Sequence, residues 1–320
     1  MAIIVNTNMS ALKTQTNLTR ATNSLNTSLE RMSTGLKINR AADDAAGLYV
    51  ATGLNSQIRG SKVALDNVAT GTNVLQTMEG DLDVMLDNLN RIRDLAVQAA
   101  NSIYSEDAMG AMKQEVQARI DEIDRIALAS NFNGLALLSG DINTGSETLT
   151  QTNDDALMQK GLRLQIGANA DANANSLTLD AEEFFNKTDN GINSMTLGKK
   201  FTALTGQDAM TTNTGIRGNL EAAFANASAA AQYITVVDQA IADISDKKST
   251  IGATMNRLAS AETSLTTTVE NNTAAKSTIM DADIAEESAE FTKSQILQQT
   301  SASLLVQANQ LPSIALSLIQ

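Results

Sequence analysis

Apolar residues recur at steps of three and four along most of the chain, which predicts amphipathic helices. The longest series begins at residue 64 and ends at residue 99, and its steps alternate between four and three. Its members are Ala64, Val68, Gly71, Leu75, Met78, Leu82, Met85, Leu89, Ile92, Ala96 and Ala99. An average repeat of about 3.5 residues is typical of a left-handed coiled coil, so we expect one long helix with a single apolar seam.

Similar repeats predict helices before and after this one. A first helix begins near Ser10, an N-cap residue type, and stops at a glycine-containing turn. Asp43 and Asp44 can cap the long helix that follows. A third helix runs from Met109 to about Ala127, heptads resume at Val237, and the last segment is amphipathic again.

The middle of the chain has a different pattern. Asn133-Gly134 lies between short apolar runs, which predicts a hairpin with a two-residue turn. Leu162, Leu164 and Ile166 alternate with polar residues, as in a strand with one buried face. We therefore expect a small β-containing domain in this region rather than the alternative, a polar linker.

The two chain ends carry opposite charge. Residues 1–40 contain five cations and one carboxylate, whereas residues 281–320 contain five carboxylates and one cation. Opposite charge favours pairing of the ends, although an exposed ion pair contributes only about 0.2–1 kcal/mol. The terminal stripes are weak, with Ser28 at a near-core position, so we expect the ends to fold fully only when neighbouring copies cover them.

These patterns together predict a mainly α fold. Both chain ends build a long antiparallel helical hairpin and coiled-coil rod, and a small β-containing outer domain is inserted between them. The expected regions are 1–44 and 278–320 as paired terminal helices of an inner coiled coil, 45–140 and 233–277 as a helical rod domain with a β-hairpin, and 141–232 as a variable, surface-exposed outer domain.

Composition argues against catalysis. The chain has no cysteine and no histidine, which removes thiol nucleophiles, Ser-His-Asp relays and the common zinc sites. We therefore expect no catalytic residue, no cofactor and no metal. The net charge is −13, which argues against nucleic-acid binding. The absence of a long apolar run argues against membrane insertion, and the start lacks the features of a cleaved leader.

Several stretches resemble bacterial flagellin, the subunit of the flagellar filament. They are IIVNTNMSALKTQTNL at the start, LERMSTGLKINRAADDAAGL (29–48), LNRIRDLAVQAAN (89–101), EVQARIDEIDRIALASNFNGLALL (115–138) and ILQQTSASLLVQANQLPSIALSLI (296–319). The resemblance covers both chain ends, in the order that the family has.

The resemblance implies a structural subunit that self-polymerises into the extracellular flagellar filament for motility. The termini would line a central channel, with the rod around them and the middle of the chain facing solvent. Implied partners are further copies of the chain, an export chaperone on the C-terminal helix, and the filament cap and junction proteins. The implied route out of the cell is unfolded export by the flagellar type III system, which makes the protein secreted.

The resemblance also implies recognition by a host Toll-like receptor. Arg91, Leu95 and Glu115 match the family's motif residues for this role, whereas Asn90 and Asp94 stand where Gln and Glu are usual. Arg91 and Leu95 lie on a helical stripe separate from the apolar seam. A compatible alternative is that this stripe packs subunit against subunit.

Twelve residues are expected to hold helices together and to make assembly contacts. They are Leu18, Leu25, Met32, Leu75, Met78, Leu82, Met85, Leu89, Ile92, Ile296, Leu304 and Leu305. Arg93 flanks the seam, and its aliphatic stem is expected to lie over it.

Other functions remain open on the sequence alone. One is a hook–filament junction protein, which shares the terminal pattern, and another is a helical coiled-coil adaptor outside the flagellum. An enzyme hosted in residues 141–232 is disfavoured, because no catalytic constellation is present. Serines and threonines there could accept glycans. The acidic run DADIAEE (281–287) fits no EF-hand spacing, so a solvated helix start is the favoured interpretation.

Overall fold

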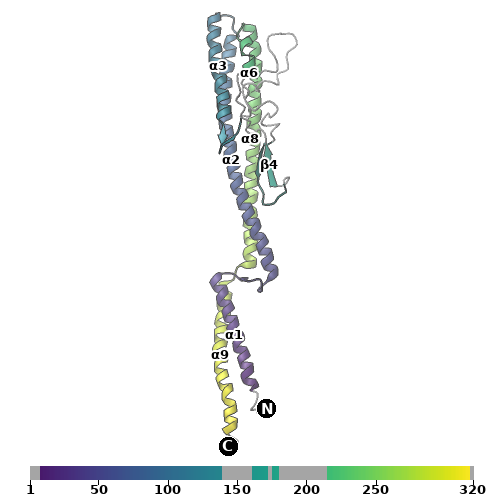
Figure 1. The fold of residues 1–320 in the computed structure, drawn as a ribbon, viewed down its shortest axis with the longest axis vertical. Helices are drawn as coiled ribbons and strands as arrows, with labels where there is room; N and C mark the ends of the chain where they lie inside the picture. Colours follow the sequence, from purple (N-terminus) through teal and green to yellow (C-terminus); the bar gives the residue numbers. More distant parts are fainter. Residues whose placement is uncertain (1–7, 139–160, 172–174, 180–214, 318–320) are drawn as a thin grey trace. The chain divides into compact units, whose positions relative to one another are not determined.

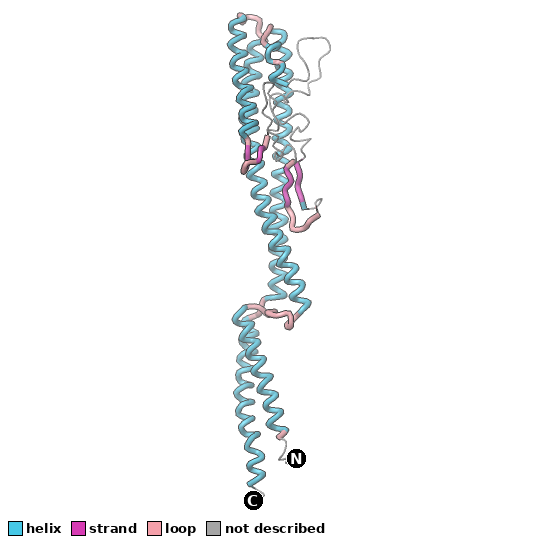
Figure 2. Tube along the Cα trace, in the orientation of Figure 1, coloured by secondary structure: helices cyan, strands magenta, loops and turns pink. Residues whose placement is uncertain are grey.

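A computed structural model of the chain describes residues 8–138, 161–171, 175–179 and 215–317 (Figure 1). Most of these residues are helical, and the strands among them form two short antiparallel pairs (Figure 2). The prediction of a mainly α fold with a small β-containing region is confirmed. The chain divides into two compact units, which are described separately.

The first unit, residues 1–59 with 268–320, contains a pair of helices from the two chain ends. They are α1 (Met9–Thr34) and α9 (Ile284–Ser317), which lie side by side and run antiparallel, with both termini at the same end of the pair (Figure 1). The unit also includes the first turns of α2 (Ala45–Ala99) and the last turns of α8 (Ala227–Met280). The expected pairing of the chain ends is therefore present.

Local side-chain chemistry sets both ends of α1. Asn8 rather than Ser10 is the N-cap, because its side chain accepts a hydrogen bond from the amide of Ala11 at 3.0 Å. At the other end Gly35 adopts φ 70° and donates its amide to the carbonyl oxygen of Arg31 at 2.8 Å. A left-handed residue after the last turn is a usual way to end a helix, and glycine takes that conformation without strain.

The second unit, residues 60–267, is built on α2, α3 (Glu106–Ala129) and α8. Its core is one continuous cluster of apolar side chains. The largest fully buried ones are Leu75, Met78, Leu82, Met85, Leu89, Ile92, Ile120, Ile123, Leu137, Leu138 and Tyr233. Since burying one large apolar side chain contributes roughly 1.5–3 kcal/mol, this cluster is the main source of stability in the unit.

A short hairpin follows α3. Strand β1 (Asn131–Phe132) pairs antiparallel with β2 (Leu135–Ala136), and Phe132 lies opposite Leu135. The two residues between them, Asn133 and Gly134, have φ values of 52° and 83°. Positive φ at both central positions is what a two-residue hairpin turn of type I′ requires, so the predicted Asn-Gly turn is confirmed.

The described parts of the middle region pack on the helices of the second unit. They comprise β3 (Leu162–Gln165), β4 (Ser176–Leu179), α6 (Gly215–Gly218) and α7 (Leu220–Ala223). Their apolar side chains join the common core of residues 60–267 instead of forming a core of their own. The unit boundaries thus fall within α2 and α8, and not at the region boundaries expected from the sequence. The remainder of residues 141–232 lies outside the described residues.

The β3–β4 pair approaches α2 at glycines. A Cβ atom at Gly71 would stand 2.4 Å from Cδ1 of Leu164, and one at Gly60 would stand 2.9 Å from Cβ of Ala168. Any larger residue at these positions would force its neighbour to move. The two glycines therefore provide the room that the strands need to pack against the helix.

Candidate interaction surfaces

Small side chains make the contact between α1 and α9, which we call the terminal seam. Its buried members are Ala21, Ser28, Ser294, Ser301 and Ala308. The three from α9 recur every seven residues, as in a coiled coil, and small side chains allow two helices to approach closely. Sequence reasoning placed Ser28 near the core but missed the three members on α9, because it selected large apolar residues there. The seven-residue spacing of serine and alanine was the available signal.

The residues predicted for this seam take two different positions. Those that are half-buried at its edges are Leu18, Leu25, Met32 and Leu305. Ile296 and Leu304 lie outside it, with 57% and 50% of their surface exposed. These two residues do not hold α1 and α9 together, and their part in assembly contacts stays a prediction. Small residues occupy that position on α9, and these two larger side chains remain exposed to solvent.

Two polar contacts fix the register of the terminal helices. Near the chain ends, Nδ2 of Asn8 donates to the carbonyl oxygen of Ala308 at 2.7 Å. At the other end of the pair, Nη1 of Arg31 donates to Oε1 of Glu287 at 3.0 Å. The side chains of Arg31 and Glu287 are only 30% and 13% exposed. A charge-assisted hydrogen bond that is largely removed from water specifies one alignment, because a shifted register would leave either charge unpaired.

The long apolar series of α2 occupies the centre of the second unit, and we call it the rod seam. Its predicted members are all fully buried: Leu75, Met78, Leu82, Met85, Leu89 and Ile92. Alternating steps of three and four keep these side chains on one face of α2. They share their core with residues of α3 and α8.

The second stripe of α2 faces α3. Nε of Arg91 donates to Oε1 of Glu115 at 2.7 Å, and both side chains remain about half exposed. On the same stripe Asn88 is buried and accepts from Nη1 of Arg119 at 3.2 Å. Leu95 is also buried, at 2% exposure. The sequence placed Leu95 on a stripe separate from the apolar seam, and in the structure this residue joins the common core of the unit. A helical wheel of α2 cannot show where α3 packs.

Arg93 contacts a third helix. Its Nε donates to Oδ1 of Asp238 on α8 at 2.6 Å, so the guanidinium bridges two helices at the edge of the core. The hydrogen bond to Asp238 raises the pKa of Arg93, and that to Glu115 likewise raises the pKa of Arg91. In return the Arg91 hydrogen bond lowers the pKa of Glu115. All three groups are therefore charged at neutral pH.

The terminal helices expose large apolar side chains, which we call the terminal apolar set. Its members are Met9, Leu12, Leu29, Ile284, Ile296, Leu297, Leu304 and Val306. Their exposure runs from 48% at Leu297 to 61% at Met9. Eight large apolar side chains, each about half exposed on two paired helices, offer apolar surface that another molecule could cover.

The described residues contain no group of three or more His, Cys, Asp or Glu side chains that could hold a metal ion. Within them, no helix combines the length and apolarity needed to cross a membrane. In the acidic run at the start of α9, Oδ1 of Asp283 accepts from the amides of Ala285 and Glu286 at 2.8 and 3.4 Å. Asp283 therefore has the role of an N-cap, as a solvated helix start requires.

Known proteins resemble this chain along its whole length. A family model described as the bacterial flagellin N-terminal helical region matches residues 5–144, and one described as the bacterial flagellin C-terminal helical region matches residues 234–319. The chain is 34% identical to Flagellin D of Vibrio cholerae over 376 residues, with 100% of both chains covered. It is 35% identical to the flagellin of Bacillus subtilis over 327 residues, with 99% of both covered.

One solved structure is similar in fold. It is a protein of Vibrio parahaemolyticus described as flagellar hook-associated, with a TM-score of 0.54 and 14% identity. The similarity covers 74% of this chain and 99% of that one. At this identity the likeness concerns the fold alone.

Proposed function

The chain belongs to the bacterial flagellin family, and we propose that it polymerises with further copies of itself into the extracellular filament of the flagellum. Members of this family are structural subunits of that filament. We infer that the chain transmits torque as part of a helical polymer and catalyses no reaction. Such a polymer needs head-to-tail interfaces that do not close into a ring.

The terminal apolar set is the observation that carries this proposal. Its side chains lie on helices whose own contact is already filled by the small residues of the terminal seam. They therefore have no partner within the described part of the chain large enough to cover them. Each side chain is already about half buried, so neighbouring copies that cover the rest would contribute roughly 0.7–1.5 kcal/mol for each one.

Two matched substitutions on α9 test the proposal. Leu304 and Gln299 are both exposed on this helix, so replacing either by serine changes a surface position. Leu304 is already half buried in the single chain, so Leu304→Ser is expected to raise the critical concentration for polymerisation by roughly 3- to 10-fold, the factor for losing burial of the remaining half of the side chain. Gln299→Ser is expected to change it little. Polymerisation of Leu304→Ser at the unaltered critical concentration would contradict the proposal.

A deletion gives a coarser test of the same function. Removing residues 297–320 is expected to leave the second unit folded, because its core lies wholly within residues 60–267. Circular dichroism would report that fold, and sedimentation would report polymer. Sedimentable filaments from the truncated chain would refute a role for α9 in assembly.

We also propose that the chain is exported unfolded through the flagellar type III system, with a chaperone bound to its C-terminal helix, and that it polymerises beneath a cap protein. Support comes from family membership and from the exposed apolar residues of α9, which a chaperone could cover before assembly. A pull-down with α9 intact and with Leu304→Ser would test the chaperone contact. Equal capture of the chaperone by the wild type and by Leu304→Ser would show that Leu304 is not part of the chaperone contact.

Recognition by a host Toll-like receptor is a second proposed role. Its support is the match of Arg91, Leu95 and Glu115 to the family motif, together with the exposure of the Arg91–Glu115 pair. Because Leu95 is buried, we assign it a packing role beneath that pair. A receptor reporter assay with monomer should lose signal in Arg91→Ala and keep it in Arg93→Ala, whose side chain pairs with Asp238 instead. Absence of signal from the wild type would remove this role.

A further inference from the structure

The first unit contains two breaks between helices, and they come from opposite ends of the chain. Residues 35–44 separate α1 from α2, and residues 281–283 separate α8 from α9. One break is long and the other is short. If they were independent, each would be a separate flexible point in the chain.

Main-chain hydrogen bonds join the two breaks. The amide of Lys37 donates to the carbonyl oxygen of Met280 at 2.6 Å, and the amide of Ala282 donates to the carbonyl oxygen of Gly35 at 3.0 Å. These two bonds form an isolated antiparallel bridge, which we call the linker bridge. It connects segments about 245 residues apart in the chain, a separation read from the sequence numbers.

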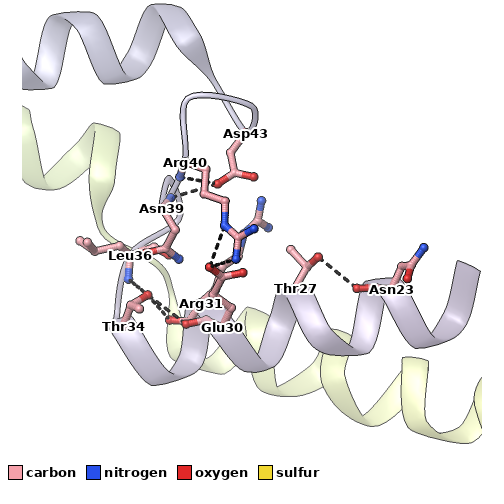
Figure 3. Close-up of polar contacts among 9 residues, drawn as sticks. All are labelled: Asn23, Thr27, Glu30, Arg31, Thr34, Leu36, Asn39, Arg40 and Asp43. Carbon is pink, nitrogen blue, oxygen red and sulfur yellow. Dashed lines mark hydrogen bonds and ion pairs between the residues drawn. The ribbon is translucent and has the colours of Figure 1, made fainter.

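The long break is itself ordered by side chains (Figure 3). Oδ2 of Asp43 accepts from the amides of Asn39 and Arg40 at 3.0 and 2.9 Å. The guanidinium of Arg40 reaches back to Oε1 of Glu30 on α1 at 2.9 Å. Hydrogen bonds from the Arg40 and Asn39 amides lower the pKa of Asp43, so this carboxylate is charged at neutral pH. The break is thus tied to the helix it leaves.

The long break is also tied to the helix that it enters, and the short break is fixed at both ends. Oδ1 of Asp44 accepts from the amide of Gly47 at 2.9 Å, which caps α2 as the sequence predicted. In the short break, Oδ2 of Asp281 accepts from Oγ of Ser277 on α8 at 2.6 Å. Asp283 caps α9 two residues later. These contacts hold each break to the helices beside it. The linker bridge is the contact that joins one break to the other.

We propose that the linker bridge couples the two breaks. The paired helices α1 and α9 then move together, as one body, relative to the adjoining turns of α2 and α8. Bending at one break alone would change the separation of Gly35 from Ala282 and of Lys37 from Met280. Both main-chain bonds would then be lost. Bending both breaks together keeps the bonds. Both bonds join residues of one chain, so the coupling acts within each subunit.

Proline substitution tests the bridge by hydrogen exchange in the full-length protein, both as monomer and as polymer, because the chain ends are expected to fold fully only when neighbouring copies cover them. Ala282→Pro removes the amide that donates to Gly35. The Lys37 amide, which is untouched by the substitution, should then exchange roughly two- to tenfold faster, the factor for loss of one supporting hydrogen bond. Ala41→Pro is the matched control. Residues 40–43 form a turn in which the Asp43 amide donates to the carbonyl oxygen of Arg40 at 3.0 Å. Ala41 is the second residue of this turn, a position that favours proline.

Distances between spin labels test the coupling. The chain has no cysteine, so cysteine pairs introduced at exposed positions are the only label sites. The pair Asn23 and Ser56 spans the long break, and the pair Ala274 and Gln295 spans the short one. Ala282→Pro should broaden both distance distributions, whereas Ala41→Pro should broaden neither.

Three results would overturn the proposal. The first is broadening of the Ala274–Gln295 distribution alone in Ala282→Pro, which would show independent breaks. The second is no broadening of either distribution. The third is unchanged exchange at Lys37. If Ala282→Pro loses helicity, Lys37→Pro removes the other bond of the linker bridge, and it should accelerate exchange at Ala282 and broaden both distributions.

Discussion

The guanidinium of Arg91 donates to the carboxylate of Glu115 at 2.7 Å and so joins α2 to α3. Two positions later, Arg93 donates to Asp238 and joins the same helix to α8. Residues i and i+2 of an α-helix point about 200° apart around its axis. Two arginines with one residue between them therefore fasten the long helix to two different neighbours, and neither forms part of a shared cationic site.

Substituting Arg91 should change the acid titration of Glu115. The hydrogen bond from Arg91 holds the pKa of Glu115 below its ordinary value near 4.5. A carboxylate with a lowered pKa in the folded state contributes stability above its unfolded pKa, and that contribution is lost as pH falls through the folded pKa. Arg91→Ala should therefore raise the pKa of Glu115, as measured by NMR titration of its side-chain carboxyl carbon.

A second pair in α3 is the control for this titration. Arg125 donates to Glu122 from the same helix and lowers the pKa of Glu122. Arg125→Ala should raise the pKa of Glu122 and leave that of Glu115 unchanged. Identical titration of Glu115 in the wild type and in Arg91→Ala would show that the ion pair does not form in solution.

Two arginines near the end of α1 should differ in their importance (Figure 3). Arg31 and its partner Glu287 are 30% and 13% exposed, whereas Arg40 and its partner Glu30 are 71% and 40% exposed. Arg31→Met leaves the Glu287 carboxylate poorly hydrated, and we expect the terminal helices to lose about 1–3 kcal/mol. Arg40→Met should cost about 0–1 kcal/mol.

Hydrogen exchange along α9 measures this difference directly. It reports on the terminal helices alone, whereas global unfolding of a chain with two units need not be two-state. Equal loss of protection in Arg31→Met and Arg40→Met would mean that burial of the Arg31–Glu287 pair contributes nothing to the pairing.

The sequence predicted those features that depend on neighbouring residues. The rod seam follows from the spacing of Leu75 to Ile92, because helical geometry alone places these side chains on one face. The turn at Asn133-Gly134 follows from the low cost of positive φ for these two residue types. Both features can be predicted from the local sequence alone.

The charge of the chain ends predicted their pairing, but individual contacts between distant segments were not predicted. Leu95 has the same pattern whether it is open to solvent or covered by α3, and only the fold decides between them. Ser294 and Ser301 were passed over because hydrophobicity does not reveal where two helices approach closely. The partner of Arg93, Asp238, lies 145 residues later, and local spacing carries no information on such a pair.

Removing one buried hydroxyl should destabilise the second unit. Tyr233 is fully buried, burial raises its pKa, and its hydroxyl donates to the carbonyl oxygen of Ile216 at 2.9 Å. Tyr233→Phe keeps the ring but removes this donor, so we expect a loss of about 1–3 kcal/mol in urea denaturation. Tyr49→Phe is the control, since Tyr49 is 83% exposed and its substitution should stay within about 0.5 kcal/mol. Equal losses would show that the Tyr233 bond is not formed.

Two glycines of α2 should respond differently to alanine. A Cβ atom added at Gly80 would have no neighbour within 4 Å among the described residues, so Gly80→Ala should gain the helix propensity of alanine, roughly 0.5–1 kcal/mol. Gly71→Ala gains the same propensity but places its Cβ atom 2.4 Å from Cδ1 of Leu164, which forces the β3 side chain to move. We expect it to gain less than Gly80→Ala or to lose stability. Urea midpoints of the two variants provide the comparison. Equal gains would mean that Leu164 shifts freely and that β3 does not require the space at Gly71.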